Sequence, residues 1–272
     1  MNEDKLKKIR QQFRVLFVAV PLLSLLAIFI IKTTSFDSSL AANTGGTSQQ
    51  KSVAPDDALV AAFKKTYPAS VSDAVELVTG KVGTMRHDMK LVTGTPIVGR
   101  AVTSLVKPAT PENATPALST KHSVEMIDNA KPGEIGVIVM EGTLEIAAMG
   151  NLMATAAKVR GMAGMVLDGA IRDIWDVRRM GLTVYARSSS PRTAVGHYAT
   201  VANNIPVECA GITVRPGDII VADDDGVVVV PQEQAEAVLK KAQEIDEREK
   251  GMFPFIRQFK SLTKAIEKFN RI

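Results

Sequence analysis

The sequence contains few residues that react through sulfur or imidazole. Among its 272 residues there is one cysteine, Cys209, so no disulfide can form within the chain and a cluster of thiolate metal ligands is excluded. No basic residue adjoins Cys209, which predicts a small buried apolar side chain rather than a nucleophile. The three histidines lack the spacing of a zinc-binding helix. One of them, His197, falls in a predicted loop and is expected at the surface.

The net charge is also small. The chain carries 33 basic and 29 acidic residues, and residues 1–32 hold six of the basic and two of the acidic ones, which leaves 27 of each sign elsewhere. A body without net charge offers no electrostatic footprint for nucleic acid, so no nucleic-acid partner is expected. No GxGxxG loop is present, and we therefore expect no nucleoside cofactor.

One long apolar run is present, at residues 15–31, which read VLFVAVPLLSLLAIFII. Its length is at the short end of the about 17–25 residues that span a membrane. Basic residues precede it, and the positive-inside rule then places the following domain outside the cytoplasm. Residues 1–32 are expected to be either an uncleaved transmembrane anchor or a secretory signal peptide, with a candidate cleavage site at Ser39–Ala41. A buried core helix is the alternative, although nothing nearby would cover a helix that is apolar on every face.

Helical and strand patterns alternate after a predicted flexible linker, residues 33–56. This alternation predicts an α/β fold for residues 57–250, followed by a basic, amphipathic helical tail at residues 251–272. The expected helices are 57–67, 73–78 (with Ser72 as N-cap and Gly80 at its end), 151–160, 173–180 and 231–249. The expected strands are 97–103, 137–140, 164–167 and 183–186, with a hairpin at 218–222 and 227–230.

The segment Asp168–Asp173, with the sequence DGAIRD, lies between a predicted buried strand and a predicted helix. Ligands of α/β proteins favour this end of a strand. Arg172 can hold a carboxylate with two parallel hydrogen bonds, and Asp173 can bind a hard cation such as Mg²⁺. A 2-oxo acid would satisfy both groups. The alternative is structural: Asp173 caps the helix and Arg172 pairs with a surface acid.

Two further segments are candidates for binding. Gly150, Asn151, Leu152 and Met153 open a predicted helix whose backbone N–H groups could hold a carboxylate. The alternative there is a glycine turn with Asn151 as the N-cap. The acidic turn Asp223–Gly226, together with Asp218, could bind Ca²⁺ or Mg²⁺, or could be a solvated hairpin turn.

Several of these motifs occur together in a known order. The run GNLMATAAKVRGMAGMVLDGAIRDIWDVRRMGLTVYAR, followed by PVECAGITVRPGDIIVADDDGVVVVP, resembles the family of 4-hydroxy-4-methyl-2-oxoglutarate aldolases, which includes the regulator of ribonuclease activity A. The resemblance covers about residues 57–250. It implies a layered α/β sandwich like the swivelling phosphohistidine domain, and homotrimers or hexamers with active sites at subunit interfaces.

The resemblance also implies a chemistry. It makes Arg172 and Asp173 the catalytic residues, with Arg172 binding the substrate carboxylate and Asp173 binding Mg²⁺ or Mn²⁺. Residues Gly150, Asn151, Leu152 and Met153 contact the substrate as well. The implied reaction is retro-aldol cleavage of a 4-hydroxy-2-oxo acid to pyruvate, and oxaloacetate decarboxylation passes through the same enolate.

The chain departs from the family at Asn151, where aldolases often carry an acidic residue that orders metal-bound water. An amide cannot act as a base, so the proton transfer must differ. Glu247 or Glu249 of a neighbouring subunit is a candidate to assist. A non-catalytic regulatory protein, similar to the ribonuclease regulator, is the alternative function.

Overall fold

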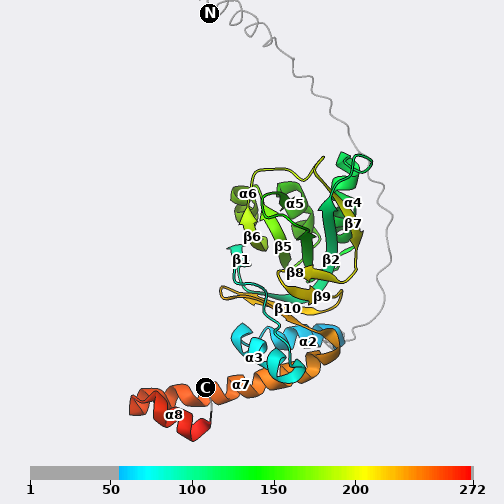
Figure 1. Ribbon diagram of the computed structural model, residues 1–272. Coiled ribbons are helices and arrows are strands. Elements are labelled where there is room, and N and C mark those ends of the chain that lie inside the picture. Colours follow the sequence, from blue (N-terminus) through cyan, green and yellow to red (C-terminus); the bar gives the residue numbers. More distant parts are fainter. Residues whose placement is uncertain (1–54, 271–272) are drawn as a thin grey trace, which may run out of the picture. The chain divides into compact units, whose positions relative to one another are not determined.

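The computed structural model describes residues 55–270 (Figure 1). The predicted anchor or signal at residues 1–32, the predicted N-terminal hydrophobic helix and almost all of the predicted linker lie outside these residues. They stay predictions, as does the location of the domain outside the cytoplasm. Within residues 55–270, no helix is both long enough and apolar enough to cross a bilayer.

The fold is α/β, as the alternating pattern predicts, and is built on a mixed sheet. Nine strands of the described part form this sheet in the order β1-β6-β5-β3-β2-β10-β11, with β4 beside β5 and β7 beside β2. The central strands β2, β3, β5 and β6 are parallel, and β1, β7, β10 and β11 pair with their neighbours in the antiparallel sense. The strands are β1 (Lys90–Thr93), β2 (Ile97–Pro108), β3 (Ile135–Met140), β4 (Ala147–Met149), β5 (Gly164–Ile171), β6 (Thr183–Ser189), β7 (Tyr198–Asn203), β10 (Ile219–Asp223) and β11 (Gly226–Val230).

Helices cover the sheet in two groups, which Figure 1 shows at opposite ends of the domain. The first group contains α4 (Pro116–Asn129), α5 (Asn151–Val159) and α6 (Ile174–Met180). The second contains α2 (Pro55–Phe63), α3 (Pro68–Thr79) and α7 (Ala235–Phe259), which pack on β10 and β11. A short hairpin of β8 (Val207–Cys209) and β9 (Ile212–Val214), the 3-10 turn η1 (Gln232–Gln234) and α8 (Leu262–Phe269) complete the described elements.

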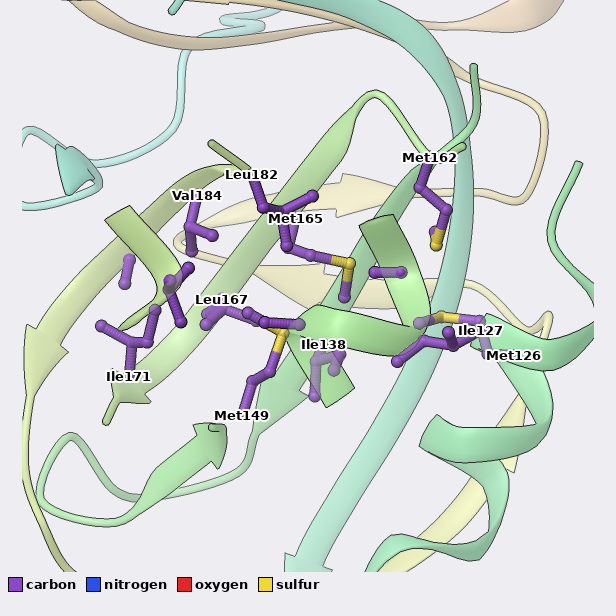
Figure 2. Packing of buried hydrophobic residues seen from close by; sticks show 14 of the residues in the cluster. Met126, Ile127, Ile138, Met149, Met162, Met165, Leu167, Ile171, Leu182 and Val184 are labelled. Atoms are coloured by element: carbon purple, nitrogen blue, oxygen red, sulfur yellow. The ribbon is translucent and has the colours of Figure 1, made fainter. Parts of the chain in front are cut away.

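The parallel strands are buried on both faces of the sheet. Along β3, for example, alternate side chains belong to two different hydrophobic clusters. Ile138 and Met140 join the cluster under α4, α5 and α6, whereas Ile135 and Val137 join the cluster on the opposite face. Figure 2 shows the first cluster, in which Met side chains fill the space between aliphatic ones. Methionine suits such gaps because its side chain is unbranched and adaptable. Burial on both faces explains why these strands read as continuous apolar runs.

The predicted helix start at Ser72 is wrong. Helix α3 begins five residues earlier than predicted, at Pro68 in place of Asp73, with Tyr67 as its N-cap. Proline suits this first turn because its φ is already helical and its missing N–H would have no partner there. The hydroxyl of Ser72 instead shares a hydrogen bond of 2.8 Å with that of Thr84. Gly80 ends the helix as predicted, in the left-handed conformation with φ of 68°.

Several other elements extend beyond their predicted ends. β2 continues to Pro108, and β5 continues to Ile171, so Arg172 and Asp173 directly follow a strand. Helix α2 begins at Pro55, inside the predicted linker. The predicted tail is helical, and α7 runs through residue 250 and through Pro254 to Phe259. Pro254 removes one backbone donor from the helix, a local cost that the helix tolerates.

A partly buried ion network joins β5, β6 and the loop before β1. Arg187 donates from Nε and Nη2 to one carboxylate oxygen of Asp88, at 3.0 and 2.6 Å, and from Nη1 to Asp168 at 2.8 Å. The other carboxylate oxygen of Asp168 accepts the N–H of Ala210. These hydrogen bonds from Arg187 hold the pKa of Asp88 below its usual value. Three chain segments therefore depend on one guanidinium.

We expect Arg187→Ala to lower the free energy of unfolding by about 3–5 kcal/mol, because the buried Asp168 would lose its charge partner. The matched change Arg192→Ala removes an exposed pair with Glu145 and should cost at most about 1 kcal/mol. Because the pKa of Asp88 is lowered in the folded state, its contribution is present above about pH 4 and is lost as the pH falls through the folded pKa. Urea unfolding at neutral and acidic pH measures both effects. Equal losses in the two variants would contradict this account.

Candidate functional site

The two candidate segments of the sequence meet at one edge of the sheet. β4 pairs in parallel with the last two residues of β5, Ala170 and Ile171. The chain leaves both strands at the same level, and the N–H of Arg172 donates to the carbonyl of Met149 at 3.1 Å. The start of α5 therefore lies against the Arg172–Asp173 pair, although the two segments are separated by about twenty residues in the sequence.

Asp173 occupies the N-cap position of α6, but its side chain does not cap that helix, so the interpretation of its carboxylate as a helix cap is wrong. Its backbone is left-handed, with φ of 58° and ψ of 32°, and its side chain makes no capping hydrogen bond to α6. An N-cap residue normally needs an extended backbone to reach the first turn. The carboxylate of Asp173 instead accepts the N–H of Asn151 at 2.9 Å, at the start of α5. Asp is among the residues that tolerate this conformation, which often marks a functional position.

Gly150 allows this close approach. It is the N-cap of α5, so the interpretation of Asn151 as the N-cap is also wrong. A Cβ atom at Gly150 would lie 2.6 Å from Oδ2 of Asp173 and 2.8 Å from Nε of Arg172. The backbone of Gly150 is extended, with φ of −133°, and any residue could adopt it. Glycine is therefore required here for space, because the two charged side chains occupy the place of a side chain.

Arg172 and Asp173 do not form a closed ion pair. The distance from Nε of Arg172 to Oδ2 of Asp173 is 3.8 Å, which is too long for a hydrogen bond. Both side chains are about two-fifths exposed, at 40% and 43%, so the pair contributes little to stability. Arg172 does lie beside a half-exposed acid, as the structural alternative expected, but that acid is the neighbouring Asp173 and the contact is long. A guanidinium in this state can bind a ligand carboxylate.

A small pocket of about 60 Å³ opens beside the guanidinium of Arg172. Since a cavity needs about 10–15 Å³ of such space to hold one water molecule, the pocket has room for about four to six heavy atoms. Polar side chains of α4 and of the loop before β7 line it together with apolar side chains of the sheet. Its lining includes Ser119, Thr120, Ser123, Met140, Ala148, Met149, Gly150, Met153, Arg172, Thr193 and Val195.

The predicted substrate-binding residues play unequal parts in this geometry. Gly150 and Met153 line the pocket with Arg172. Asn151 holds Asp173 through its backbone, and its side-chain oxygen accepts from Thr155 at 3.3 Å. The side chain of Leu152 is 88% exposed and does not line the pocket. The first-turn N–H groups of α5 have no partner within the helix and favour an anionic ligand.

Sequence reasoning missed two parts of the pocket. Ser119 and Ser123 lie four residues apart in α4, and this spacing on one helix face is a signal that could have indicated them. Ser123 shares a hydrogen bond of 2.8 Å with Ser104, which fixes it against β2. Thr193 and Val195 come from an irregular loop, and no pattern in the sequence indicates that this loop reaches Arg172.

A divalent cation fits this site only as a partly hydrated ion. Within residues 55–270, no group of three or more His, Cys, Asp or Glu side chains is placed to hold a metal. Mg²⁺ needs no such cage, because it keeps several waters and takes one or two carboxylates plus oxygens of the ligand. The half-exposed carboxylate of Asp173 is the group at the site that could serve in this way.

The third candidate segment is structural. The carboxylate of Asp218 is buried and accepts the N–H groups of Arg215 and Gln232 at 2.8 and 3.0 Å, which joins two loops. Burial raises the pKa of Asp218 in spite of these bonds. In the β10–β11 turn, Asp223 accepts the N–H of Asp225, as expected of a hairpin turn.

The remaining candidates lie away from the pocket. Cys209 is fully buried, as predicted, and burial raises the pKa of its thiol well above the usual value. His197 is exposed, as predicted. Glu247 pairs with Lys250, and both Glu247 and Glu249 lie on α7, at the opposite end of the domain from α5 and α6 (Figure 1). Neither reaches Arg172 of its own chain, so their assistance stays a prediction about a neighbouring subunit.

A larger hollow, of about 500 Å³, lies where Arg187 and Asp168 meet the ends of β3 and β8. This hollow is larger than the pocket at Arg172, but its charged side chains already pair with one another or with neighbouring residues. Arg187 already donates to two carboxylates, and Glu141 at the rim pairs with Lys107 at 3.2 Å. We therefore place the candidate site at Arg172.

Comparison with known proteins gives the family and the fold. The RraA-like family model, described as Aldolase/RraA, matches residues 68–229. A protein of Halalkalibacterium halodurans named "Putative 4-hydroxy-4-methyl-2-oxoglutarate aldolase" is 40% identical over 117 residues, which are 42% of this chain and 53% of that protein. The match thus spans about half the length of that relative.

Two solved structures share the fold. A protein from Pseudomonas syringae pv. tomato str. DC3000 has a TM-score of 0.70 and 27% identity, over 78% of this chain and 93% of that one. Streptomyces coelicolor RraAS2, described as an unusual member of the RNase ES inhibitor RraA protein family, has a TM-score of 0.65 and 26% identity, over 72% and 96%. Since the family model covers more than half of the chain and includes every residue of the candidate site, the chain belongs to the RraA-like family of aldolases and RraA proteins.

Proposed function

We propose that this protein is a divalent-metal-dependent lyase that cleaves 4-hydroxy-2-oxo acids, such as 4-hydroxy-4-methyl-2-oxoglutarate, to pyruvate, and that it also decarboxylates oxaloacetate. The observation that carries the proposal is the Arg172–Asp173 pair, held open against Gly150 beside a pocket of about 60 Å³. This pocket suits the carboxylate and adjacent carbonyl that all these substrates share. The named relative supports the substrate class.

The residues would divide the work as follows. Arg172 binds the C1 carboxylate, and its positive charge stabilises the enolate that develops next to it. The first-turn N–H groups of α5 favour the same negative charge. Asp173 would hold Mg²⁺ or Mn²⁺, which supplies polarisation of the C2 carbonyl when bound. Asn151 orients Asp173 through its N–H but has no basic group to accept a proton.

The base must then come from water or from another subunit. We propose that the protein is a trimer or hexamer in which Glu247 or Glu249 of a neighbour completes the site. Apolar side chains exposed around the site support this arrangement: Leu152 on α5 is 88% exposed and Trp175 on α6 is 70% exposed. Large apolar side chains exposed on neighbouring helices are typical of protein interfaces.

A non-catalytic regulatory role is the second candidate, and one observation favours it. Asn151 stands where aldolases of the family often carry an acid, and the fold resembles that of an RNase ES inhibitor. In that case the site would bind a 2-oxo acid without cleaving it. Turnover separates the two functions, whereas binding alone does not.

We expect Arg172→Ala and Asp173→Ala each to lower pyruvate release from oxaloacetate with Mg²⁺ by at least about 100-fold, because each removes a charge that stabilises the enolate. Arg178→Ala and Asp176→Ala, on the exposed side of α6, are matched controls and should keep the activity. A coupled assay for pyruvate measures the rate. If the unmodified protein releases no pyruvate from oxaloacetate or from any 4-hydroxy-2-oxo acid with Mg²⁺ or Mn²⁺, the enzyme proposal fails.

Gly150→Ala should separate activity from stability. The backbone at Gly150 accepts alanine, but the new methyl group would displace the ends of the Arg172 and Asp173 side chains. A displacement of about 1 Å can cost about 100-fold in rate. Gly142→Ala is the opposite control: its φ of 77° makes alanine cost about 1–2 kcal/mol, yet open space surrounds it and it does not line the pocket. Thermal unfolding and initial rates should show that Gly150→Ala loses activity but keeps stability, whereas Gly142→Ala loses stability but keeps activity. An active Gly150→Ala protein would contradict the proposed geometry.

Trp175→Asp should dissociate the proposed oligomer, because it places a charge in an apolar contact. Asp176→Asn, at the next position, is the control and should leave the assembly intact. Native mass spectrometry gives the number of subunits in each. A monomeric unmodified protein that retains full activity would rule out a site shared between subunits.

A further inference from the structure

The C-terminal end of the chain forms a helical hairpin, residues 248–270, in which α8 folds back on α7 (Figure 1). Ala265 of α8 is fully buried in this contact. Gly251 gives the Phe269 ring room, since a Cβ atom there would lie 2.8 Å from a ring carbon. Ser261 caps α8 by accepting the N–H of Lys264 at 3.2 Å. The hairpin is therefore a packed unit with a defined turn.

Aromatic packing inside the hairpin fixes the position of that turn. The rings of Phe255 and Phe259 lie 4.5 Å apart, and Phe255 also contacts Phe269 edge-on at 6.0 Å. The ammonium group of Lys268 lies 4.6 Å above the Phe255 ring. One side of α7 is thus held against α8, and the turn between them is presented outward.

The hairpin tip, residues 257–264, combines apolar and basic side chains. Phe259 and Leu262 are 46% and 52% exposed, and Arg257, Lys260 and Lys264 are exposed beside them. Residues 251–266 contain no acidic residue. The basic side chains of the tip therefore have no acidic neighbour in this stretch of sequence.

Charge along the whole chain follows the same division. Residues 251–272 carry five basic residues and one acidic residue, and residues 1–32 carry six and two. The middle part, residues 33–250, carries 22 basic and 26 acidic residues. A negatively charged surface would attract the basic C-terminal segment more than the middle part of the chain.

We propose that the hairpin tip docks on the surface of an anionic lipid bilayer. At such a surface Phe259 and Leu262 enter the boundary between headgroups and acyl chains, while the basic groups remain at the level of the phosphates. Each basic residue near an anionic surface strengthens binding by about a factor of five. A groove on a second copy of the chain would instead have to supply carboxylates to the same basic groups.

The sequence of the N-terminal part favours a lipid partner. The uncharged apolar run at residues 15–31 has the composition of a membrane-inserting segment. Stable attachment to a bilayer usually requires two signals, and a second one gains from the high local concentration that the first creates. The hairpin tip has the character of such a second signal.

The full chain can test this with one fluorophore. Leu262→Cys provides a reactive thiol for an environment-sensitive label, because Cys209 is fully buried and stays unlabelled. Lys240→Cys, exposed near the start of α7, is the matched control. Vesicles of phosphatidylcholine alone are compared with vesicles that also contain phosphatidylglycerol. We expect a blue shift of the label at position 262 with the anionic vesicles alone, its loss at about 1 M salt, where screening is about 3 Å, and no shift at position 240.

The variant Lys260→Gln/Lys264→Gln extends the test. It should require about 30-fold more anionic lipid for the same shift, since two charges are removed. An equal shift with both kinds of vesicle would overturn the proposal, because charge would then have no part. A shift without vesicles that grows with protein concentration would also overturn it and would assign the tip to a second copy of the chain.

Discussion

The hydrogen bond from the N–H of Asn151 to the carboxylate of Asp173 determines the geometry of the candidate site. It ties the first turn of α5 to the chain that leaves β5, and so joins two segments that the sequence presents separately. Without it, Asp173 would be free to cap its own helix, as Asp commonly does at this position. The bond engages Oδ2 of Asp173, and the neighbouring Arg172 lines the pocket.

This arrangement requires an unfavourable backbone conformation at Asp173 and a glycine at position 150. Asp173 takes a left-handed backbone conformation that most residues avoid. The absence of a side chain at Gly150 leaves the space that the side chains of Arg172 and Asp173 occupy beside the helix. The Arg172–Asp173 ion pair adds little stability in return, because it is long and half-exposed. Stability comes instead from the two-faced core and from Arg187, which binds three segments together. The arginine that supports the fold, Arg187, is therefore a different residue from Arg172 of the candidate site.

Much of the fold can be predicted from the sequence, because a single local signal determines the structure of many segments. Continuous apolar runs predicted β3 and β5, and Gly80 and Gly181 ended helices as expected, with positive φ. The predicted helix ends were wrong where two local signals for a helix end lay close together in the sequence. Ser72 is a good N-cap, but Pro68 starts the helix earlier and the serine bonds Thr84 instead. The helix predicted to end at residue 249 continues through Gly251 and Pro254 to Phe259, where α8 packs against it.

The sequence indicated the candidate segments but not how they meet. Asp168–Ile171 were expected to follow a strand but form the end of β5, and Asp168 bonds Arg187 on the other face of the sheet. Residues that alternate along a strand point to opposite faces, and the irregular end of β5 hides which face each takes. The loop that brings Thr193 and Val195 to Arg172 has no periodic pattern at all, so only the tertiary fold could place it.

The central claim is that Arg172 and Asp173 together form a site for a 2-oxo acid and a divalent cation. Calorimetric titration with oxalate, a planar mimic of the enolate of pyruvate, tests it most directly and does not depend on turnover. We predict one oxalate bound per site in the presence of Mg²⁺, with binding lost in Arg172→Ala and weakened without the cation. Equal oxalate binding by the unmodified protein and Arg172→Ala, or no binding by either, would contradict the claim.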